Sequence, residues 1–343
     1  MLCVDVVNFG FDFAFLKSRL SGSFDWYVKD TRNILIDLPA PKLVGNAEIP
    51  TQNAARVRNN GFDLDLRWRD RVGPVNWYIG GNLAYVKNRV VTYKGDEATI
   101  SGANMIKEGY PINVQYVLSV DRILQTEDDM LLVKEIQKNA PVDPLTGVKK
   151  NPFSAYGTPQ LGDFLYKDLN GDGLIDENDR YAVGNGNISP WIFGIQAGLD
   201  WKGVDFSVIL QGNAGYKVLW MDNFNMGYLN YGGPISSRLA EGAWRTGRTD
   251  AEAPRLLTRT NTINNQPSDY WVEDKSYVRL KNIQMGYTLP ETLTSKAGIS
   301  KARLYLSAEN LLTFTPYHGI DPEVGGTTYP TLKQFVFGLN LTF

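Results

Sequence analysis

The stretch from Asp168 to Asp179 is rich in oxygen-bearing side chains and has the spacing of a calcium-binding loop. In that pattern, oxygen ligands follow a first Asp at alternating positions, and a Gly at the sixth position makes the sharp turn. The predicted ligands are Asp168, Asn170, Asp172, the backbone carbonyl of Leu174, Asp176 through a water molecule, and Asp179. We therefore predict a bound Ca²⁺ that braces the loop, although Asp179 reaches less far than the usual Glu at the twelfth position.

The segments on either side of this loop indicate what an ion would do there. Residues 162–167 have an extended pattern, and the residues from Tyr181 onward have a loop pattern, so no helices flank the loop. A calcium site that switches a protein between states uses two flanking helices, so this site would be structural. The competing interpretation is a turn rich in Asn, Asp and Gly that holds no ion.

The composition argues against several classes of protein and of site. A net charge of -2, from 35 basic and 37 acidic residues, offers no basic surface for nucleic acid. The single cysteine, Cys3, excludes an internal disulfide and a thiolate metal cluster. The single histidine, His318, argues against a zinc site or a histidine-based catalytic triad. The sequence contains no apolar run of about 18 residues, so we predict no transmembrane helix.

Apolar and polar residues alternate along nine segments, as they do along strands with one apolar face. The last segment runs to the end of the sequence, with Phe335, Phe337 and Phe343 on its apolar face. In a soluble protein such a strand would fray or aggregate, whereas in an outer-membrane barrel its apolar face meets lipid. The nine segments are 4–15, 18–30, 57–69, 75–91, 189–201, 203–213, 277–289, 301–313 and 333–343.

The connections between these segments are of two kinds. Short turns are predicted at 17–18, 71–74 and 202–203, and long polar tracts at 31–56, 92–188, 214–276 and 314–332. Short turns on one side and long loops on the other are typical of outer-membrane barrels. If Phe343 ends at the periplasm, every short turn falls there, provided that 92–188 adds an even number of strands to the wall or none.

We therefore predict an all-β chain that forms the wall of an antiparallel transmembrane β-barrel, with about 9–11 strands and long extracellular loops. One short amphipathic helix is predicted from Glu127 to Lys138. Met1 leads directly into strand-like sequence without the features of a signal peptide. We therefore expect residues 1–343 to be the C-terminal part of a longer protein.

Two groups of side chains are candidates for contact with a solute. Asp63, Asp65, Arg67 and Arg69 would face the inside of the barrel, where they would touch a solute or an inner domain, or form charge pairs across strands. Aromatic residues of the long loops would stack on sugars, grip a partner, or pack the loops on themselves. Packing is favoured, because buried aromatic area offsets the cost of ordering long loops. These aromatic residues are Trp220, Tyr228, Tyr231, Trp244, Tyr270 and Trp271.

Four segments of the sequence resemble the SusC/RagA family of TonB-dependent outer-membrane transporters from Bacteroidota-type bacteria. They are Asn60–Asp63, the loop Asp168–Asp179, Ser276–Pro290 and Ser307–Glu323. The last two are long and specific, and looser similarity extends back to residue 4.

The resemblance implies a fold, a location, a function and partners. The fold would be the C-terminal portion of a barrel of about 22 strands, a size at which the lumen is plugged. The plug domain and the N-terminal strands would lie outside this sequence. The full-length protein would import oligosaccharides or peptides across the outer membrane, with energy relayed by TonB through the plug and a SusD-like surface lipoprotein as lid.

Two other functions compete with transport. A secreted calcium-binding β-sandwich, such as a carbohydrate-binding module, would account for the Asp-rich loop and the many aromatic residues. It leaves the outward-facing Phe and Leu residues and the unequal connections unexplained. An enzyme such as a glycosidase would use two carboxylates, but no pair is singled out by spacing, so we predict no enzyme.

Overall fold

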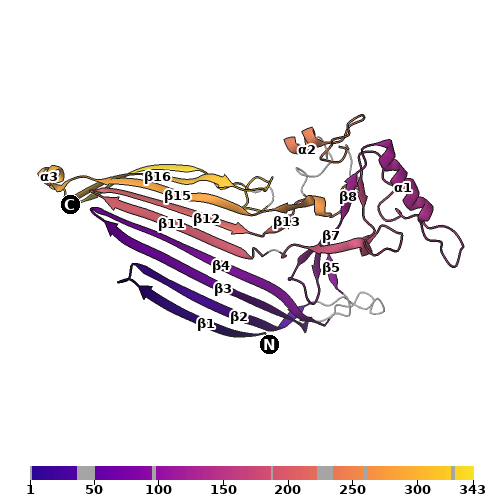
Figure 1. Ribbon diagram of the computed structural model, residues 1–343, viewed down its shortest axis with the longest axis horizontal. Helices are drawn as coiled ribbons and strands as arrows, with labels where there is room; N and C mark the ends of the chain where they lie inside the picture. Colours follow the sequence, from indigo (N-terminus) through magenta and orange to yellow (C-terminus); the bar gives the residue numbers. More distant parts are fainter. Residues whose placement is uncertain are drawn as a thin grey trace.

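Nine long strands form one antiparallel sheet in the computed structural model, which describes residues 2–36, 51–94, 98–186, 188–221, 235–257, 262–325 and 329–343. The strands are β1 (Cys3–Phe15), β2 (Leu20–Ile36), β3 (Gln52–Val72), β4 (Val75–Tyr93), β11 (Trp191–Trp201), β12 (Val204–Ala214), β15 (Tyr277–Thr288), β16 (Lys301–Phe314) and β17 (Gln334–Thr342). Strands that follow one another in this order are paired, with β1 and β17 at the two edges, which makes an up-and-down meander (Figure 1). All nine predicted strands are confirmed.

The two ends of the sheet differ in their connections, as the sequence predicts. One end has the turns 16–19, 73–74 and 202–203 and the segment 289–300, which holds α3 (Glu291–Thr294) and η4 (Ser295–Ala297). At the turn 202–203, Lys202 and Gly203 have φ angles of 49° and 87°, which match the twist of a two-residue hairpin. The N-terminus lies toward the opposite, loop end of the sheet and the C-terminus at the turn end (Figure 1).

The insertions at the loop end form a smaller folded unit, which we call the loop unit. Between β4 and β11 it contains β5 (Thr99–Ser101), β6 (Asn104–Ile106), β7 (Val114–Leu118), β8 (Val120–Ile123), α1 (Glu127–Asn139), β9 (Phe164–Tyr166), η2 (Glu177–Asp179) and β10 (Arg180–Val183). Between β12 and β15 it contains β13 (Lys217–Leu219), α2 (Ser237–Gly242), η3 (Asp269–Trp271) and β14 (Val272–Asp274). Apart from the last residues of β4, the described residues of 92–188 add no strand to the wall. The short turns therefore all lie at one end of the sheet, which required this segment to add an even number of strands or none.

The predicted helix is confirmed as α1, which ends one residue later than predicted. Thr126 begins it by accepting the N–H of Asp129, whose carboxylate in turn accepts the N–H of Thr126. The predicted loop from Tyr181 onward is wrong at its start, because β10 pairs with β7. The four residues of β10 form a strand because they pair with β7, which is distant in the chain, so their local sequence pattern does not reveal the strand.

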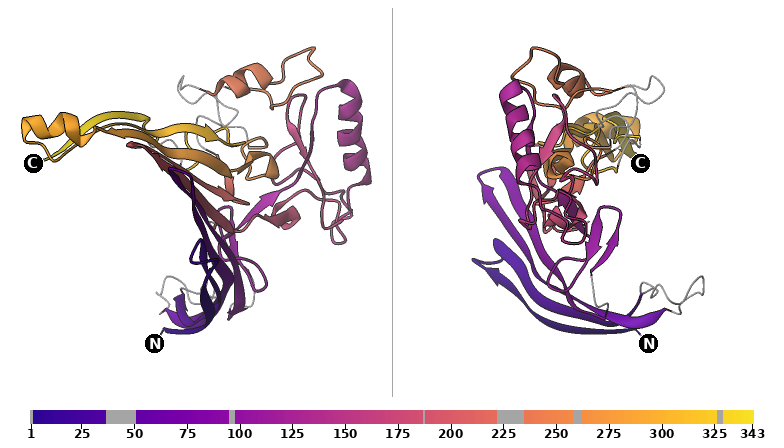
Figure 2. Two further views of the ribbon diagram at one scale, coloured as in Figure 1. Left: turned by 60° about the vertical axis from the view of Figure 1, so that its left-hand side comes forward. Right: turned by 90° about the vertical axis from the view of Figure 1, so that its right-hand side faces the viewer.

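The larger apolar core lies in the loop unit, whereas one face of the large sheet leaves most of its apolar side chains exposed. Leu118, Phe164 and Trp271 are buried in the loop unit, while Phe335 and Phe337 on β17 are 75% and 71% exposed. A β-sandwich would bury such a face against a second sheet. The curved sheet instead extends away from the loop unit (Figure 2), which contradicts the β-sandwich alternative. Among the described residues, no helix is long and apolar enough to cross a membrane.

The exposed apolar face carries a row of aromatic residues near its loop end. The row consists of Phe9, Trp26, Phe62, Tyr85 and Trp191, which are paired in register across five adjacent strands. The rings of Tyr85 and Trp191 have centroids 4.4 Å apart. On β4, Trp77 lies on the same face about 26 Å further along the strand, toward the turn end. With a strand tilt of about 40°, this separation corresponds to roughly 20 Å across the membrane, somewhat less than the apolar band of about 25 Å that aromatic girdles flank in outer-membrane barrels.

Candidate functional site

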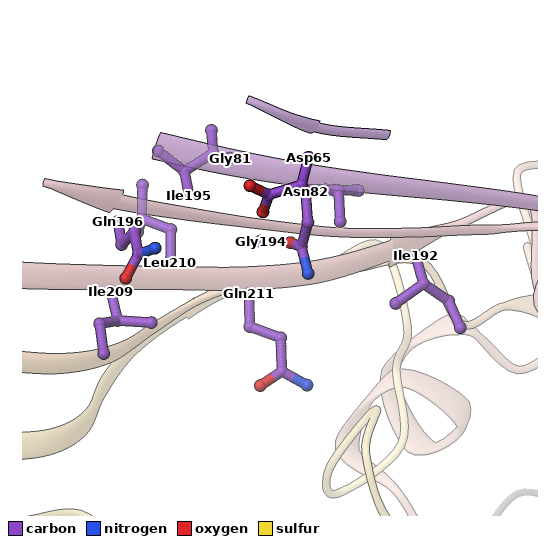
Figure 3. A pocket seen from close by; sticks show the side chains of 11 residues that line it. Asp65, Gly81, Asn82, Ile192, Gly194, Ile195, Gln196, Ile209, Leu210 and Gln211 are labelled. Carbon is purple, nitrogen blue, oxygen red and sulfur yellow. The ribbon is translucent and has the colours of Figure 1, made fainter. Parts of the chain in front are cut away.

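The polar face of the sheet carries the side chains that a solute or an inner domain would meet. At its centre, β3, β4, β11 and β12 border a hollow of about 410 Å³ (Figure 3). A side chain at Gly194 would reduce this space, because its Cβ would lie 2.6 Å from Oδ1 of Asn82. The hollow offers amide donors and acceptors next to a carboxylate, beside two isoleucines. These residues are Asp65, Asn82, Gln196, Gln211, Ile192 and Ile209.

The same polar face carries four aspartates on its first three strands, Asp12, Asp25, Asp63 and Asp65. The register places Asp25 directly opposite Asp63, an arrangement that is unfavourable for two negative charges. Arg67 and Arg69 lie opposite Gly80 and Tyr78 rather than opposite an acid. Within the described residues, the charge pairs across strands that the sequence allowed for Asp63, Asp65, Arg67 and Arg69 are not formed. These charges therefore remain available to a solute or an inner domain.

Nearer the turn end, an ion pair crosses the polar face from β12 to β16. Nε of Arg303 donates to Oδ1 of Asp205 at 2.8 Å, over the intervening strand β15. Gly286 on β15 makes room for this contact, because a Cβ there would lie 2.6 Å from Oδ1 of Asp205. The pair ties together two strands that are not neighbours in the sheet.

Aromatic residues join the two insertions of the loop unit. Trp271, which is 1% exposed, packs on Phe164 with ring centroids 6.0 Å apart and on Tyr270 at 4.7 Å. Trp220 is 4% exposed, and Nε1 of Trp244 donates to the carbonyl of Gln125. The packing role is thus confirmed for Trp220, Trp244, Tyr270 and Trp271, while Tyr228 and Tyr231 lie outside the described residues.

A buried carboxylate also joins the two insertions. Asp163 has no exposed surface, and its two oxygens accept Nε and Nη2 of Arg255 at 2.7 and 2.9 Å. Nδ2 of Asn264 donates to the same carboxylate at 2.9 Å. The charge of Asp163 is therefore paired and hydrogen-bonded, as a buried charge must be.

The segments Ser276–Pro290 and Ser307–Glu323 meet at a buried ion cluster. Arg279 on β15, with a side chain 4% exposed, donates to Asp321 and to Glu323 at 2.7 Å each. Its Nε donates to Oγ1 of Thr313 at 2.9 Å. The cluster ties the connection between β16 and β17, residues 315–333, to the end of the sheet.

Further contacts close this cluster. Lys281 lies 3.2 Å from Glu323, and the N–H of Thr331 donates to Asp321 at 2.8 Å. The local sequence pattern does not single out these residues. Uninterrupted alternation would place Arg279 and Lys281 on the apolar face with Ile283 and Met285. Only the bulge between Leu280 and Asn282 turns Arg279 to the polar face, opposite Gln211.

The ion cluster predicts that residues 315–333 dock in a pH-dependent way. Burial alone would raise the pKa of Asp321, but donors from Glu323, Arg279 and Thr331 lower that pKa to about 2 from an ordinary value of 3.8. Because its pKa is lowered in the docked state, the Asp321 carboxylate stabilises the docked loop above pH 3.8 by about 2 kcal/mol. This stabilisation is lost as the pH falls toward 2 and the carboxylate becomes protonated.

A spin label at the exposed position 320 tests this prediction. The label is expected to become more mobile as the pH falls from about 4 to about 2. In an Asp321→Asn control, the label should be mobile throughout that range. A label whose mobility does not change with pH in the wild-type protein contradicts the prediction.

The Asp-rich loop is closed by hydrogen bonds from its own backbone. Oδ1 and Oδ2 of Asp168 accept the N–H groups of Gly171 and Gly173 at 2.6 and 2.8 Å. Asp179, which has no exposed surface, accepts the N–H groups of Leu169 at 2.8 Å and of Asp176 at 2.9 Å. Asp168 and Asp179, at the first and twelfth positions of the predicted calcium loop, thus stabilise its turns by accepting backbone N–H groups.

The other predicted ligands make similar local contacts. Asn170 accepts the N–H of Asp172, Asp172 accepts the N–H of Leu174, and Asp176 accepts the N–H of Asn178, each at 2.8 Å. Within the described part of the chain, no three His, Cys, Asp or Glu side chains converge as they would around a metal ion. An ion would therefore have to draw these oxygens together, and calcium stays a prediction for this loop.

The chain matches one protein family over most of its length. The family model for the TonB-dependent receptor-like β-barrel matches residues 5–311. TonB-dependent receptor P3 of Formosa agariphila is 28% identical over 364 residues, which cover 98% of this chain and 34% of that protein. TonB-dependent receptor SusC of Bacteroides thetaiotaomicron is 26% identical over 356 residues, which cover 98% of this chain and 31% of SusC.

Solved structures agree with these relatives. A structure of the RagAB peptide transporter superposes with a TM-score of 0.72 at 26% identity, over 99% of this chain and 35% of that chain. The chain thus spans about a third of the length of the curated relatives and of this structural relative.

These matches confirm the predicted resemblance to SusC and RagA and the predicted all-β barrel fold. The exposed apolar face, the aromatic row and the unequal connections have the same explanation, since such barrels expose this face to lipid. The chain belongs to the TonB-dependent receptor β-barrel family, and its nine-stranded sheet is part of the wall of an outer-membrane barrel.

Proposed function

We propose that the protein imports oligosaccharides or peptides through the outer membrane, with energy relayed by TonB. The observation that carries this proposal is the polar face of the wall, where amides surround the hollow at Gly194 beside Asp65, a carboxylate that forms no ion pair with a described residue. Such groups form hydrogen bonds with sugar hydroxyls and with peptide backbones alike. The similarity to RagAB, which is a peptide transporter, supports a solute of this kind.

In this proposal the protein acts by transport and not by catalysis. The wall and the extracellular loops come from residues 1–343. The plug that contacts TonB and the remaining strands belong to the rest of the intact protein. The share of the relatives' length that the chain spans, about a third, supports this division.

The proposed partner on the cell surface is a SusD-like lipoprotein that covers the loop unit. The loop unit has its own core, so it offers a preformed surface on which a lid can rest. Exposed apolar residues on that unit support the proposal, among them Leu145 at 94% and Val148 at 64% exposure. The names of the relatives SusC and RagAB support the same kind of partner.

Growth and uptake measurements test the proposal. A strain that lacks the gene for the intact protein is expected to lose growth on one class of oligosaccharide or peptide as sole nutrient. A strain that lacks TonB should show the same loss. Growth that needs the gene but not TonB would contradict the energised mechanism, and unchanged growth on every such nutrient would contradict import.

We also propose that the loop Asp168–Asp179 binds calcium as a structural brace, which the order of its oxygen-bearing residues supports. Calcium is expected to slow proteolysis within the loop of the intact protein relative to a chelator. An Asp172→Ala variant should lose this protection, because Asp172 is a predicted ligand whose side chain is not needed by the hydrogen bonds of Asp168 and Asp179. Equal cleavage with calcium and with chelator would mean that the backbone hydrogen bonds alone close the loop.

A further inference from the structure

The lipid-facing side of the sheet has a groove of about 440 Å³ at Gly81. The groove is present because residue 81 has no side chain and no neighbour fills the space. A Cβ there would meet the carbonyl oxygen of Gly194 at 3.2 Å and Cγ1 of Ile195 at 3.9 Å. By contrast, the ring of Phe13 covers Gly22 on the same face. The apolar side chains that line the groove are Leu20, Leu64, Leu66, Trp68, Ile79, Leu83, Phe193 and Ile195.

Two cations lie on the same face of β4, beyond the aromatic row. Side chains alternate along a strand, so Lys87 and Arg89 face the same way as Gly81 and Tyr85. Both are exposed, and neither forms an ion pair with any described residue. A second hollow, of about 240 Å³, lies beside them against Gly109 and Pro190. The neighbouring Arg58 already has a partner, because it donates to Asp30 at 2.8 Å, a carboxylate that it shares with Arg56.

The spacing along β4 matches the layers of an outer leaflet. Gly81 lies four residues, or about 13 Å along the strand, from Tyr85 in the aromatic row. With a strand tilt of about 40°, the groove lies roughly 10 Å below that row, within the outer half of the apolar band of about 25 Å. Lys87 and Arg89 lie on the other side of the row, at the level of the lipid headgroups.

We propose that this face binds a phosphate-bearing lipid of the outer leaflet, with its phosphate between Lys87 and Arg89 and an acyl chain in the groove at Gly81. A lipid fits better than another occupant, because the groove is continuous with the face that already meets the membrane and the two cations complement an anionic headgroup. The site lies on the outside of the wall. Lipid binding at this site therefore requires only that the wall lies in the membrane, and it does not depend on the proposed solute.

Spin-labelled lipids test the site in the intact protein reconstituted into phosphatidylcholine vesicles. Phosphatidic acid labelled near its chain end is expected to associate with the protein more strongly than labelled phosphatidylcholine. The double variant K87Q/R89Q should lower that preference about 25-fold, because each of the two cations near an anionic surface contributes about 1 kcal/mol, or about fivefold. The control K17Q/K202Q removes the same charge at the turn end and should leave the preference unchanged.

A second variant tests the groove independently of the charges. Gly81→Leu fills the space and is expected to remove the excess of the motionally restricted component that labelled phosphatidic acid shows over labelled phosphatidylcholine. Heat-modifiable gel mobility verifies that each variant is folded. An equal preference in wild type and K87Q/R89Q, or a Gly81→Leu spectrum identical to wild type, would overturn the proposal. Displacement of the lipid by inorganic phosphate at constant ionic strength would identify a free-anion site and would overturn it as well.

Discussion

Replacing Arg279 with methionine is expected to weaken the docking of residues 315–333 by about 3–5 kcal/mol, the usual result of removing one partner from a buried ion pair. Arg279 is 4% exposed and holds both Asp321 and Glu323 at 2.7 Å, so the variant leaves two carboxylates without their main cation. Proteolysis of residues 315–333 in outer-membrane vesicles measures the effect. Cleavage is expected to accelerate by at least about a hundredfold if the free loop is the form that is cut.

The matched control is Lys281→Met, which removes a cation from the same cluster. Lys281 is 36% exposed and makes a single contact of 3.2 Å, so about 1 kcal/mol or less is expected. If both variants are cleaved at the wild-type rate, the cluster does not hold the loop. If both accelerate cleavage equally, total charge and not the buried geometry of Arg279 explains the result.

Replacing Trp271 with alanine is expected to destabilise the loop unit by about 3–5 kcal/mol through the cavity that it leaves. Trp271 is 1% exposed, and it packs on Phe164 from the other insertion. The substitution also removes the donor that bonds the carbonyl of Asn264 at 3.0 Å. Hydrogen exchange of the intact protein should show loss of protection in α1, β8 and β9, while the strands of the wall keep theirs.

The control for this prediction is Leu145→Ala. Leu145 lies in the same loop unit but is 94% exposed, so its truncation should change the exchange rates very little. Loss of protection in the wall strands of Trp271→Ala would show that the loop unit and the sheet unfold together. Unchanged protection throughout would show that the two insertions do not depend on this contact.

The wall could be predicted from the sequence, because strand alternation is a local property. Residues such as Phe335, Phe337 and Leu339 reveal their common face through their spacing alone, without knowledge of any partner strand. Connection lengths are also local, and they were sufficient to assign each strand its direction. The order of oxygen-bearing residues in the loop Asp168–Asp179 was visible in the same way, but its hydrogen bonds to backbone amides were not.

The candidate site depends on contacts between residues that are far apart in the chain, which a pattern in one segment does not reveal. Arg279 meets Asp321 across 42 residues, and Asp163 meets Arg255 across 92. The sequence allows Asp63 to pair with a basic residue of a neighbouring strand, but the register places Asp25 opposite Asp63. A shift of one residue in the register would move every side chain to the other face of the strand. Alternation therefore predicts which residues line a wall, whereas only the register in the tertiary structure decides which of them meet.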